Sequence, residues 1–164
     1  MKKVLVINAS ARLVNSQSRK LTEVFVDRWK RVYANSMINF RELGNGHVPH
    51  INEEWVVAAS RPAAARTENE NSILETSNSY IAELREADVI VLGSPMNNWS
   101  IPSTLKAYID QVLRVNETFK VNAADAQRPY TGLLQNKTLY LLLSRGGKDY
   151  EKGEPNEHLN FQST

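Results

Sequence analysis

A polar loop at residues 10–18 carries the side chains best suited to hold a ligand. It follows an apolar run at residues 4–7, precedes a segment with helical periodicity and contains no acidic residue. Its hydroxyl and amide side chains belong to Ser10, Asn15, Ser16, Gln17 and Ser18. The free amides and the dipole at the start of a helix favour an anion. The loop therefore predicts a phosphate cradle, although Ser16 or Ser18 could equally serve only to cap the helix.

The same region contains two cations, Arg12 and Arg19, which could also attract an anion. A helix dipole contributes about 0.3 to 1 kcal/mol to anion binding, whereas each hydrogen bond to a charged group contributes about 1.5 to 3 kcal/mol. Three or four loop donors therefore outweigh one arginine, and we expect the hydroxyls and amides to matter more than the guanidinium groups.

Two further loops follow apolar runs and could complete the same site. One contains Pro95, Met96, Asn97, Asn98 and Trp99, and the other contains Ser144, Arg145, Gly146 and Gly147. Met96 and Trp99 could pack on the edges of a planar ring or in the core, and the Asn98 amide can both donate and accept. The two glycines would let backbone amides approach a ligand, or form a plain turn. Ligands of open α/β sheets bind where such loops meet, so we predict one composite site.

Residue types exclude several other chemistries for this arrangement. The chain has no cysteine, which removes thiolate nucleophiles, disulfides and Cys zinc sites, so any redox function needs a bound cofactor. The acids of a response regulator are missing after residues 4–7 and 89–92, and the chain has neither a Walker A motif nor a G-x-G-x-x-G loop after its first apolar run. His47 and His50 have no clear supporting carboxylates, so we expect no metal site.

The periodicity of the chain predicts the elements that position these loops. Apolar runs predict parallel strands buried on both faces at residues 4–7, 89–92 and 139–143, and alternation predicts an edge strand at 37–43. Helical spacing recurs at residues 21–32, 73–84 and 105–112, the first with an apolar stripe of Leu21, Val24, Phe25, Trp29 and Val32. Residues 46–70 have no sustained period beyond a possible short helix near Trp55, and 122–131 is a polar connection. This order predicts a doubly wound parallel sheet.

Length and composition narrow the class of protein further. With 164 residues, of which 41% are hydrophobic and 23% charged, the chain predicts a single globular domain. A net charge of +2 is too small to support binding to nucleic acid or a polybasic membrane anchor. The apolar run near the start is four residues long, too short for a secretory signal, so we expect a cytoplasmic protein.

Four motifs, in the same order along the chain, make the sequence similar to the FMN-dependent NADH azoreductase family, whose members are flavodoxin-like quinone reductases. The motifs are Lys3 to Ile7 with Ser10, then Ser16-Gln17-Ser18, then Ser94 to Trp99, and Ser144 to Gly147, together with the helix containing Leu105 to Asp110. The resemblance covers most of residues 2–160. It implies an α/β, three-layer flavodoxin-like fold with strand order 2-1-3-4, in which the family's fifth strand is missing, and it implies a homodimer.

The resemblance also implies a cofactor, a reaction and roles for the loops. Ser10 and Ser16 to Ser18 would hold the FMN phosphate, and the second and third loops would flank the isoalloxazine ring. The expected cofactor-binding residues are Ser10, Ser16, Gln17, Ser18, Pro95, Met96, Asn97, Asn98, Trp99, Ser144, Arg145, Gly146 and Gly147. The implied reaction is ping-pong: NADH reduces the flavin by hydride transfer, and a quinone or aromatic azo compound then takes two electrons. No side-chain acid or base is expected to be essential, because the cofactor carries the chemistry.

Two alternatives to a reductase remain open from the sequence. A flavodoxin-type electron carrier would bind FMN without turning over NADH, but such carriers are usually strongly acidic. A non-enzymatic paralogue or fragment would keep the fold, and the chain does stop at Thr164, before the family's last strand and helix. The strand at residues 139–143 would then lie at the sheet edge. The family also commonly has an aromatic residue where this chain has Asn97, which bears on substrate stacking.

Overall fold

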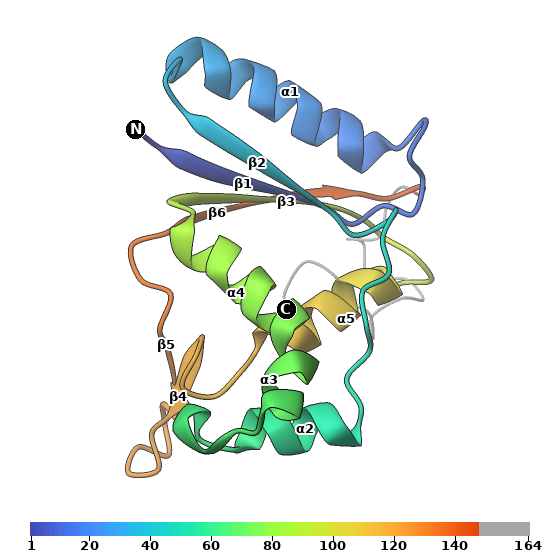
Figure 1. The fold of residues 1–164 in the computed structure, drawn as a ribbon. Coiled ribbons are helices and arrows are strands. Elements are labelled where there is room, and N and C mark those ends of the chain that lie inside the picture. The colour runs from blue at the N-terminus through green and yellow to red at the C-terminus, as the bar shows by residue number, and fades with distance from the viewer. Residues whose placement is uncertain (148–164) are drawn as a thin grey trace.

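A four-stranded parallel sheet forms the centre of the molecule in the computed structural model, which describes residues 1–147 (Figure 1). The strands are β1 (Lys3–Asn8), β2 (Met37–Glu42), β3 (Val89–Pro95) and β6 (Thr138–Ser144), in the order β2-β1-β3-β6. Every neighbouring pair is parallel, and Val6 of β1 lies opposite Phe40 on one side and Val91 on the other. The predicted strand order is therefore confirmed, with β6 as the fourth strand.

Helices cover both faces of this sheet. Helix α1 (Gln17–Val32) lies on one face, while α4 (Glu75–Glu86) and α5 (Ser103–Val112) lie on the other (Figure 1). The chain crosses from β1 to β2 through α1 and returns to β3 through α4, so the point where the strand order reverses lies between β1 and β3. Within residues 1–147, every helix is too short or too polar to span a lipid bilayer.

The two central strands are buried on both faces, as their apolar runs predicted. Val4 and Val6 point toward α1 and pack with Val26 and Val91, whereas Leu5 and Ile7 face α4 and α5. The larger cluster on that second face includes Tyr80, Ile81, Leu105, Tyr108 and Val112. Strand pairing on both edges and helices on both faces bury most residues of these two strands.

The prediction that residues 139–143 are buried on both faces is wrong. Leu139 and Leu141 are 55% and 52% exposed, although Leu142 packs in the cluster beneath α1. Among the described residues β6 has one sheet neighbour, β3, so it forms the edge that the alternative reading of the sequence expected. An apolar run shows which side chains of a strand are suited to burial. Which of them are buried depends on the strands and helices that pack beside it.

The predicted apolar stripe of α1 is also only partly right. Leu21, Val24 and Val32 are exposed, while Phe25 and Trp29 are half-buried and contact the cluster around Val26. The buried residues of the helix are Ser18, Thr22 and Val26. A Cβ atom at Gly93 of β3 would lie 2.4 Å from Cγ2 of Thr22, so helix and sheet approach closely. Small polar residues fit this contact better than leucine does.

The segment between β2 and α4 folds into three short helices instead of a loop. These are α2 (Glu53–Ser60), the 3-10 helix η1 (Ala63–Ala65) and α3 (Glu68–Ile73). The expected helix near Trp55 is confirmed: Asn52 caps it by accepting a hydrogen bond from the backbone N–H of Trp55 at 2.9 Å. Trp55, Ala58 and Leu74 form a small core of their own.

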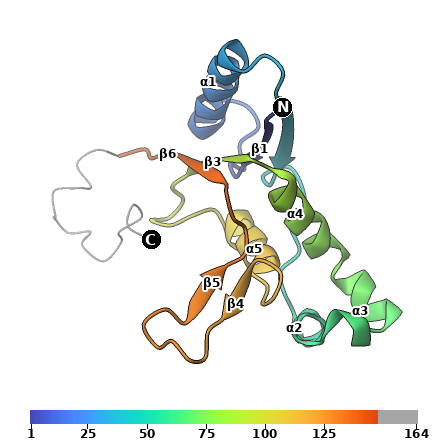
Figure 2. The same cartoon turned by 90° about the vertical axis from the view of Figure 1, so that its left-hand side faces the viewer.

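A β-hairpin that the sequence did not predict joins α5 to β6 (Figure 2). Its strands β4 (Phe119–Val121) and β5 (Tyr130–Gly132) pair antiparallel, and most of the predicted polar connection at residues 122–131 forms the loop between them. Each strand has three residues, which is too short for period-2 alternation to stand out.

Candidate functional site

A cleft of about 450 Å³ opens at the carboxyl ends of β1, β3 and β6, where the three predicted loops meet. Its lining residues are Ser10, Ala11, Arg12, Asn15, Ser16, Gln17, Pro95, Met96, Asn97, Ser144, Arg145 and Gly146. The cleft therefore lies beside the reversal of strand order between β1 and β3, which is the usual ligand site of such sheets. Its volume is within the range of small-molecule sites.

The first loop presents the amino terminus of α1 to this cleft. Ser16 is the N-cap and its Oγ accepts a hydrogen bond from the backbone N–H of Arg19 at 3.3 Å, while the first turn contains no acid. Ser10 Oγ accepts from the backbone N–H of Arg12 at 3.2 Å. Both readings of Ser16 from the sequence are thus compatible with its position, since it caps the helix and also lines the cleft.

Ser18 belongs to the predicted set, but it does not line the cleft. Its side chain is 1% exposed, and its Oγ lies 3.3 Å from Ser16 Oγ. Ser18 is one of the small residues by which α1 packs against β3, where the backbone carbonyl oxygen of Ser18 would lie 3.2 Å from a Cβ at Gly93. Ser18 therefore contacts the cleft only through Ser16.

A polar network behind the first loop uses one of its two arginines. Arg19 forms an ion pair with Glu42 at the end of β2, and its Nη2 donates to the carbonyl oxygen of Ser10 at 3.4 Å. Asn8 Nδ2 donates to the same Glu42 carboxylate at 2.5 Å, and Asn8 Oδ1 accepts from Thr22 Oγ1 at 2.8 Å. Arg19 therefore braces the loop from outside the cleft, and Arg12 is the arginine of this loop that lines it.

Gly44, just after β2, holds the first loop from the other side. A Cβ atom at this position would lie 1.8 Å from the carbonyl oxygen of Ser10, a distance that no side chain could occupy. The backbone N–H of Leu43 also donates to the carbonyl of Asn8 at 2.9 Å. The close contact of these two backbone segments fixes the position of Ser10 in the wall of the cleft.

The second loop contains a tight turn with unusual backbone angles. Asn97 and Ser100 exchange two backbone hydrogen bonds of 2.8 and 2.9 Å around Asn98 and Trp99, whose φ angles are 47° and 66°. Two successive positive φ angles are what a type I′ turn requires, and asparagine or glycine normally supplies them. A tryptophan in the left-handed region costs about 1 to 3 kcal/mol, and such strain clusters at functional sites.

This turn places Asn98 and Trp99 outside the residues that line the cleft, so their expected contact with a cofactor stays a prediction. Both are exposed, Trp99 to 40%, because they occupy the tip of the turn beyond Asn97. The base of the loop is tied to the third loop, since the backbone N–H of Met96 donates to the carbonyl of Ser144 at 2.7 Å.

In the third loop, Gly147 does not line the cleft either, whereas Gly146 does. A Cβ atom at Gly146 would meet nothing within 4 Å, so no protein contact among the described residues requires glycine there. The expected close approach of a ligand to these glycines stays a prediction.

Three lining residues, Ala11, Arg12 and Asn15, lie outside the expected cofactor-binding set, although the sequence had placed Asn15 among the donors of the first loop and Arg12 among its cations. The signal for them was their place in the same loop as Ser10 and Ser16. Asn15 has a φ of 59°, which turns the chain into α1, and the residue lies in the wall of the cleft.

The chemistry of the described lining is that of a binding site without an acid or base. Its ionisable members are Arg12 and Arg145, and none of its described members is a carboxylate, histidine, tyrosine or lysine. The lining is thus positively charged and rich in hydrogen-bond donors, which suits an anionic ligand. Proton or hydride chemistry at this site would have to come from the bound molecule.

Comparison with known proteins places this site in a family. The profile of the flavodoxin-like fold family matches residues 2–164. The FMN-dependent NADH:quinone oxidoreductase of Azotobacter vinelandii is 42% identical over 158 residues, which are 96% of this chain and 76% of that protein. An FMN-dependent NADH:quinone oxidoreductase of Trichormus variabilis is 41% identical over 160 residues, covering 98% of this chain and 73% of that protein.

Solved structures agree with the sequence comparison. The azoreductase of Bacillus anthracis strain Sterne superposes with a TM-score of 0.84 at 29% identity, covering 97% of this chain and 75% of that one. An FMN-dependent NADH-azoreductase of Bacillus anthracis strain Ames Ancestor, solved in complex with FMN, superposes with a TM-score of 0.78 at 26% identity, covering 93% and 74%. The chain therefore belongs to the flavodoxin-like fold family, as a relative of these quinone oxidoreductases and azoreductases.

Proposed function

We propose that this protein is an FMN-dependent NADH:quinone oxidoreductase that also reduces aromatic azo compounds. The observation that carries the proposal is the donor-rich, positively charged cleft at the amino terminus of α1, beside the reversal of strand order. Relatives of 36 to 42% identity are named FMN-dependent NADH:quinone oxidoreductases, and structural neighbours are named azoreductases. FMN, when bound, supplies the chemistry by taking a hydride from NADH and passing two electrons to the acceptor.

The donors of the cleft fit the phosphate group of FMN. Ser10, Ser16 and Gln17 surround the start of α1, where the free backbone amides and the dipole favour an anion. Ser18 supports this role indirectly. If its buried hydroxyl donates to Ser16 Oγ, the hydrogen of Ser16 is left to donate into the cleft.

The second and third loops supply the surfaces for the flavin ring. Pro95, Met96 and Asn97 line one side of the cleft, and Ser144, Arg145 and Gly146 line another. We assign Asn98, Trp99 and Gly147 to the outer rim of the same site, where they would contact the substrate or the ring edge. The role of the protein is to orient the two ligands and to provide hydrogen-bond donors, and no lining side chain serves as acid or base.

A flavin titration of the 164-residue chain tests the proposal. Purified protein is titrated with FMN, followed by anaerobic addition of NADH while the flavin absorbance is recorded. We expect binding in the sub-micromolar range, as about 0.3 kcal/mol for each of roughly 30 heavy atoms suggests, and bleaching by NADH that quinone reverses. Binding without bleaching would favour an electron carrier, and absence of binding would favour the non-enzymatic alternative.

We further propose that the protein is a cytoplasmic homodimer and that residues 1–164 form one domain, of which residues 148–164 lie outside the described part. Apolar side chains on the segment before and within α2 support a dimer, since Ile51 is 39% and Val57 49% exposed. NADH, the proposed electron donor, is abundant in the cytoplasm, which supports this location. Light scattering should give twice the chain mass of 18.6 kDa, and a monomeric mass with full activity would refute the dimer. Cell fractionation tests the location.

A further inference from the structure

A second cavity, of about 620 Å³, lies between the α2–η1 segment and the turn that follows α5. It shares no lining residue with the cleft described above. Its walls combine apolar side chains, among them Trp55, Leu113 and Val115, with the cations Arg61, Arg66 and Arg114. Glu117 is the one carboxylate among its described lining residues. The cavity is thus an apolar pocket with an excess of positive charge.

Arg114 is the unusual member of this cavity, because it is buried and only half paired. It is 2% exposed, and its Nη1 donates to Ser77 Oγ at 3.1 Å and to Asn78 Oδ1 at 2.6 Å. Its Nε and Nη2 are buried and have no hydrogen-bond acceptor among residues 1–147. These two N–H groups lie on one edge of the guanidinium plane and form a fork that matches two oxygens of a carboxylate or phosphate. Buried donors of this kind normally have an acceptor.

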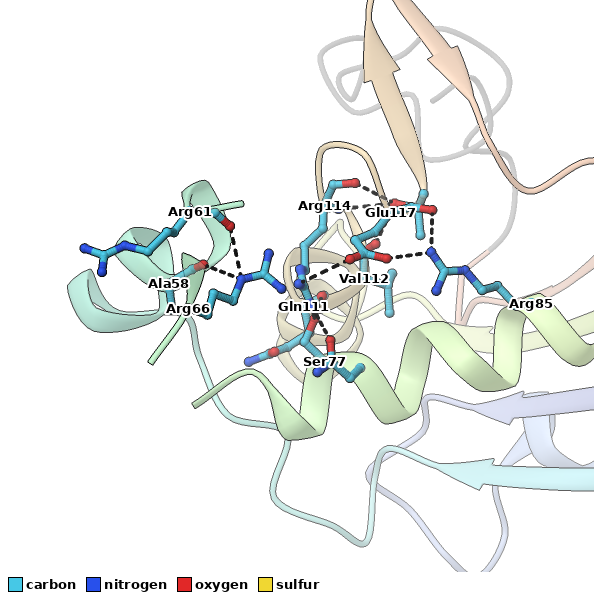
Figure 3. Close-up of polar contacts among 11 residues, drawn as sticks. Ala58, Arg61, Arg66, Ser77, Arg85, Gln111, Val112, Arg114 and Glu117 are labelled. Carbon is cyan, nitrogen blue, oxygen red and sulfur yellow. Dashed lines mark hydrogen bonds and ion pairs between the residues drawn. The ribbon is translucent and has the colours of Figure 1, made fainter. Parts of the chain in front are cut away.

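The protein's own carboxylate does not complete this fork. Glu117 Oε1 lies 3.7 Å from Arg114 Nη2, which is an ion pair but too long for a hydrogen bond. The other oxygen of Glu117 accepts from Arg85 at 2.5 Å, so two arginines share one carboxylate (Figure 3). Burial lowers the pKa of Arg114, and although Glu117 opposes this effect, the positive charge of Arg66 adds to it.

Arg66 adds a second cation on the opposite side of the cavity. Its Nε donates to the carbonyl oxygens of Ala58 and Arg61 at 3.0 and 3.1 Å, which holds the side chain in place at the end of α2. Its guanidinium group points toward that of Arg114 (Figure 3). Two like charges that face each other in one cavity repel, and an anion between them would turn this repulsion into attraction.

We propose that this cavity binds a small oxyanion, a carboxylate or phosphate group, through the Nε and Nη2 edge of Arg114, with Arg66 as the second cation. Two oxygens of the anion would accept the hydrogen bonds that Arg114 lacks. The apolar wall formed by Trp55 and Leu113 favours a ligand whose anionic group is attached to a compact apolar body. This inference does not depend on flavin binding.

The test is to observe the arginine Nε–H resonances by NMR while the FMN-free, 164-residue chain is titrated. Inorganic phosphate and benzoate are added separately, with sodium chloride keeping the ionic strength constant. We expect a saturable shift of the Arg114 resonance, which the Arg114→Lys variant identifies by its disappearance. If that variant does not fold, sequential assignment identifies the resonance instead. Phosphate saturating at lower concentration than benzoate indicates a phosphate site, and the reverse indicates a carboxylate site.

Two matched variants decide whether the cavity is responsible. Arg66→Gln removes the second cation and should weaken binding at least tenfold. Arg31→Gln removes the same charge from the exposed surface of α1, on the other face of the sheet, and should leave the affinity unchanged. The proposal is overturned if neither anion shifts Arg114 more than chloride does, or if both variants weaken binding equally.

Discussion

Replacing Gly44 by alanine should both destabilise the fold and weaken FMN binding. The added Cβ would lie 1.8 Å from the carbonyl oxygen of Ser10 and 2.6 Å from its carbonyl carbon, so the backbone of the first loop must move. Overpacking against backbone costs about 3 kcal/mol. Because Ser10 lines the cleft, the displacement also moves a proposed phosphate ligand, and we expect the Kd for FMN to rise at least tenfold.

Gly46 provides the control for this experiment. It lies two residues further along the same turn, and a Cβ there would meet only the carbonyl oxygen of Glu42, at 3.6 Å. Gly46→Ala should therefore leave stability within about 0.5 kcal/mol of the parent, the usual range for a surface substitution. Urea denaturation and fluorescence titration with FMN measure the two effects. Equal stability and affinity in both variants would mean that the contact between residue 44 and Ser10 does not hold the loop in place.

Much of this architecture could be predicted from local sequence patterns. The runs at residues 4–7 and 89–92 are apolar at every position, which is typical of a strand covered on both faces, and they form the two central strands. Loops at the ends of parallel strands must meet at one edge. The position of the cleft therefore followed once the strands were identified, and the resemblance supplied their order.

Other features depend on contacts between distant parts of the chain. Ser18 and Thr22 face the sheet because Gly93 lets α1 approach closely, and hydrophobic periodicity instead favoured Leu21 and Val24. The exposure of Leu139 depends on which elements lie beside β6. Arg114 is buried although charged residues usually lie at the surface, because Ser77 and Asn78 of another helix pair with one end of its guanidinium group. No pattern along the sequence contains this information.

The sequence left open whether Ser16 caps α1 or binds a phosphate, and the two roles predict different results for Ser16→Ala. Loss of the cap should cost about 1 kcal/mol of stability. Loss of a hydrogen bond to a charged phosphate should cost about 1.5 to 3 kcal/mol of binding, which raises the Kd for FMN about 10- to 100-fold. The Oγ atom can do both when Ser18 is the donor in the Ser16–Ser18 contact, because Ser16 Oγ then accepts from the backbone N–H of Arg19 and keeps its own hydrogen for the cleft.

Asn52→Ala is the control that separates loss of a helix cap from loss of a ligand contact. Asn52 caps α2 in the same way as Ser16 caps α1, and it does not line the cleft. Its side chain accepts from the backbone N–H of Trp55 at 2.9 Å. Both variants should lose similar stability in urea denaturation, and only Ser16→Ala should lose FMN affinity in a fluorescence titration at a temperature where both are folded. If the Kd of Ser16→Ala stays at the parent value, Ser16 is a cap alone, and the phosphate must depend on the backbone amides of α1 with Ser10 and Gln17.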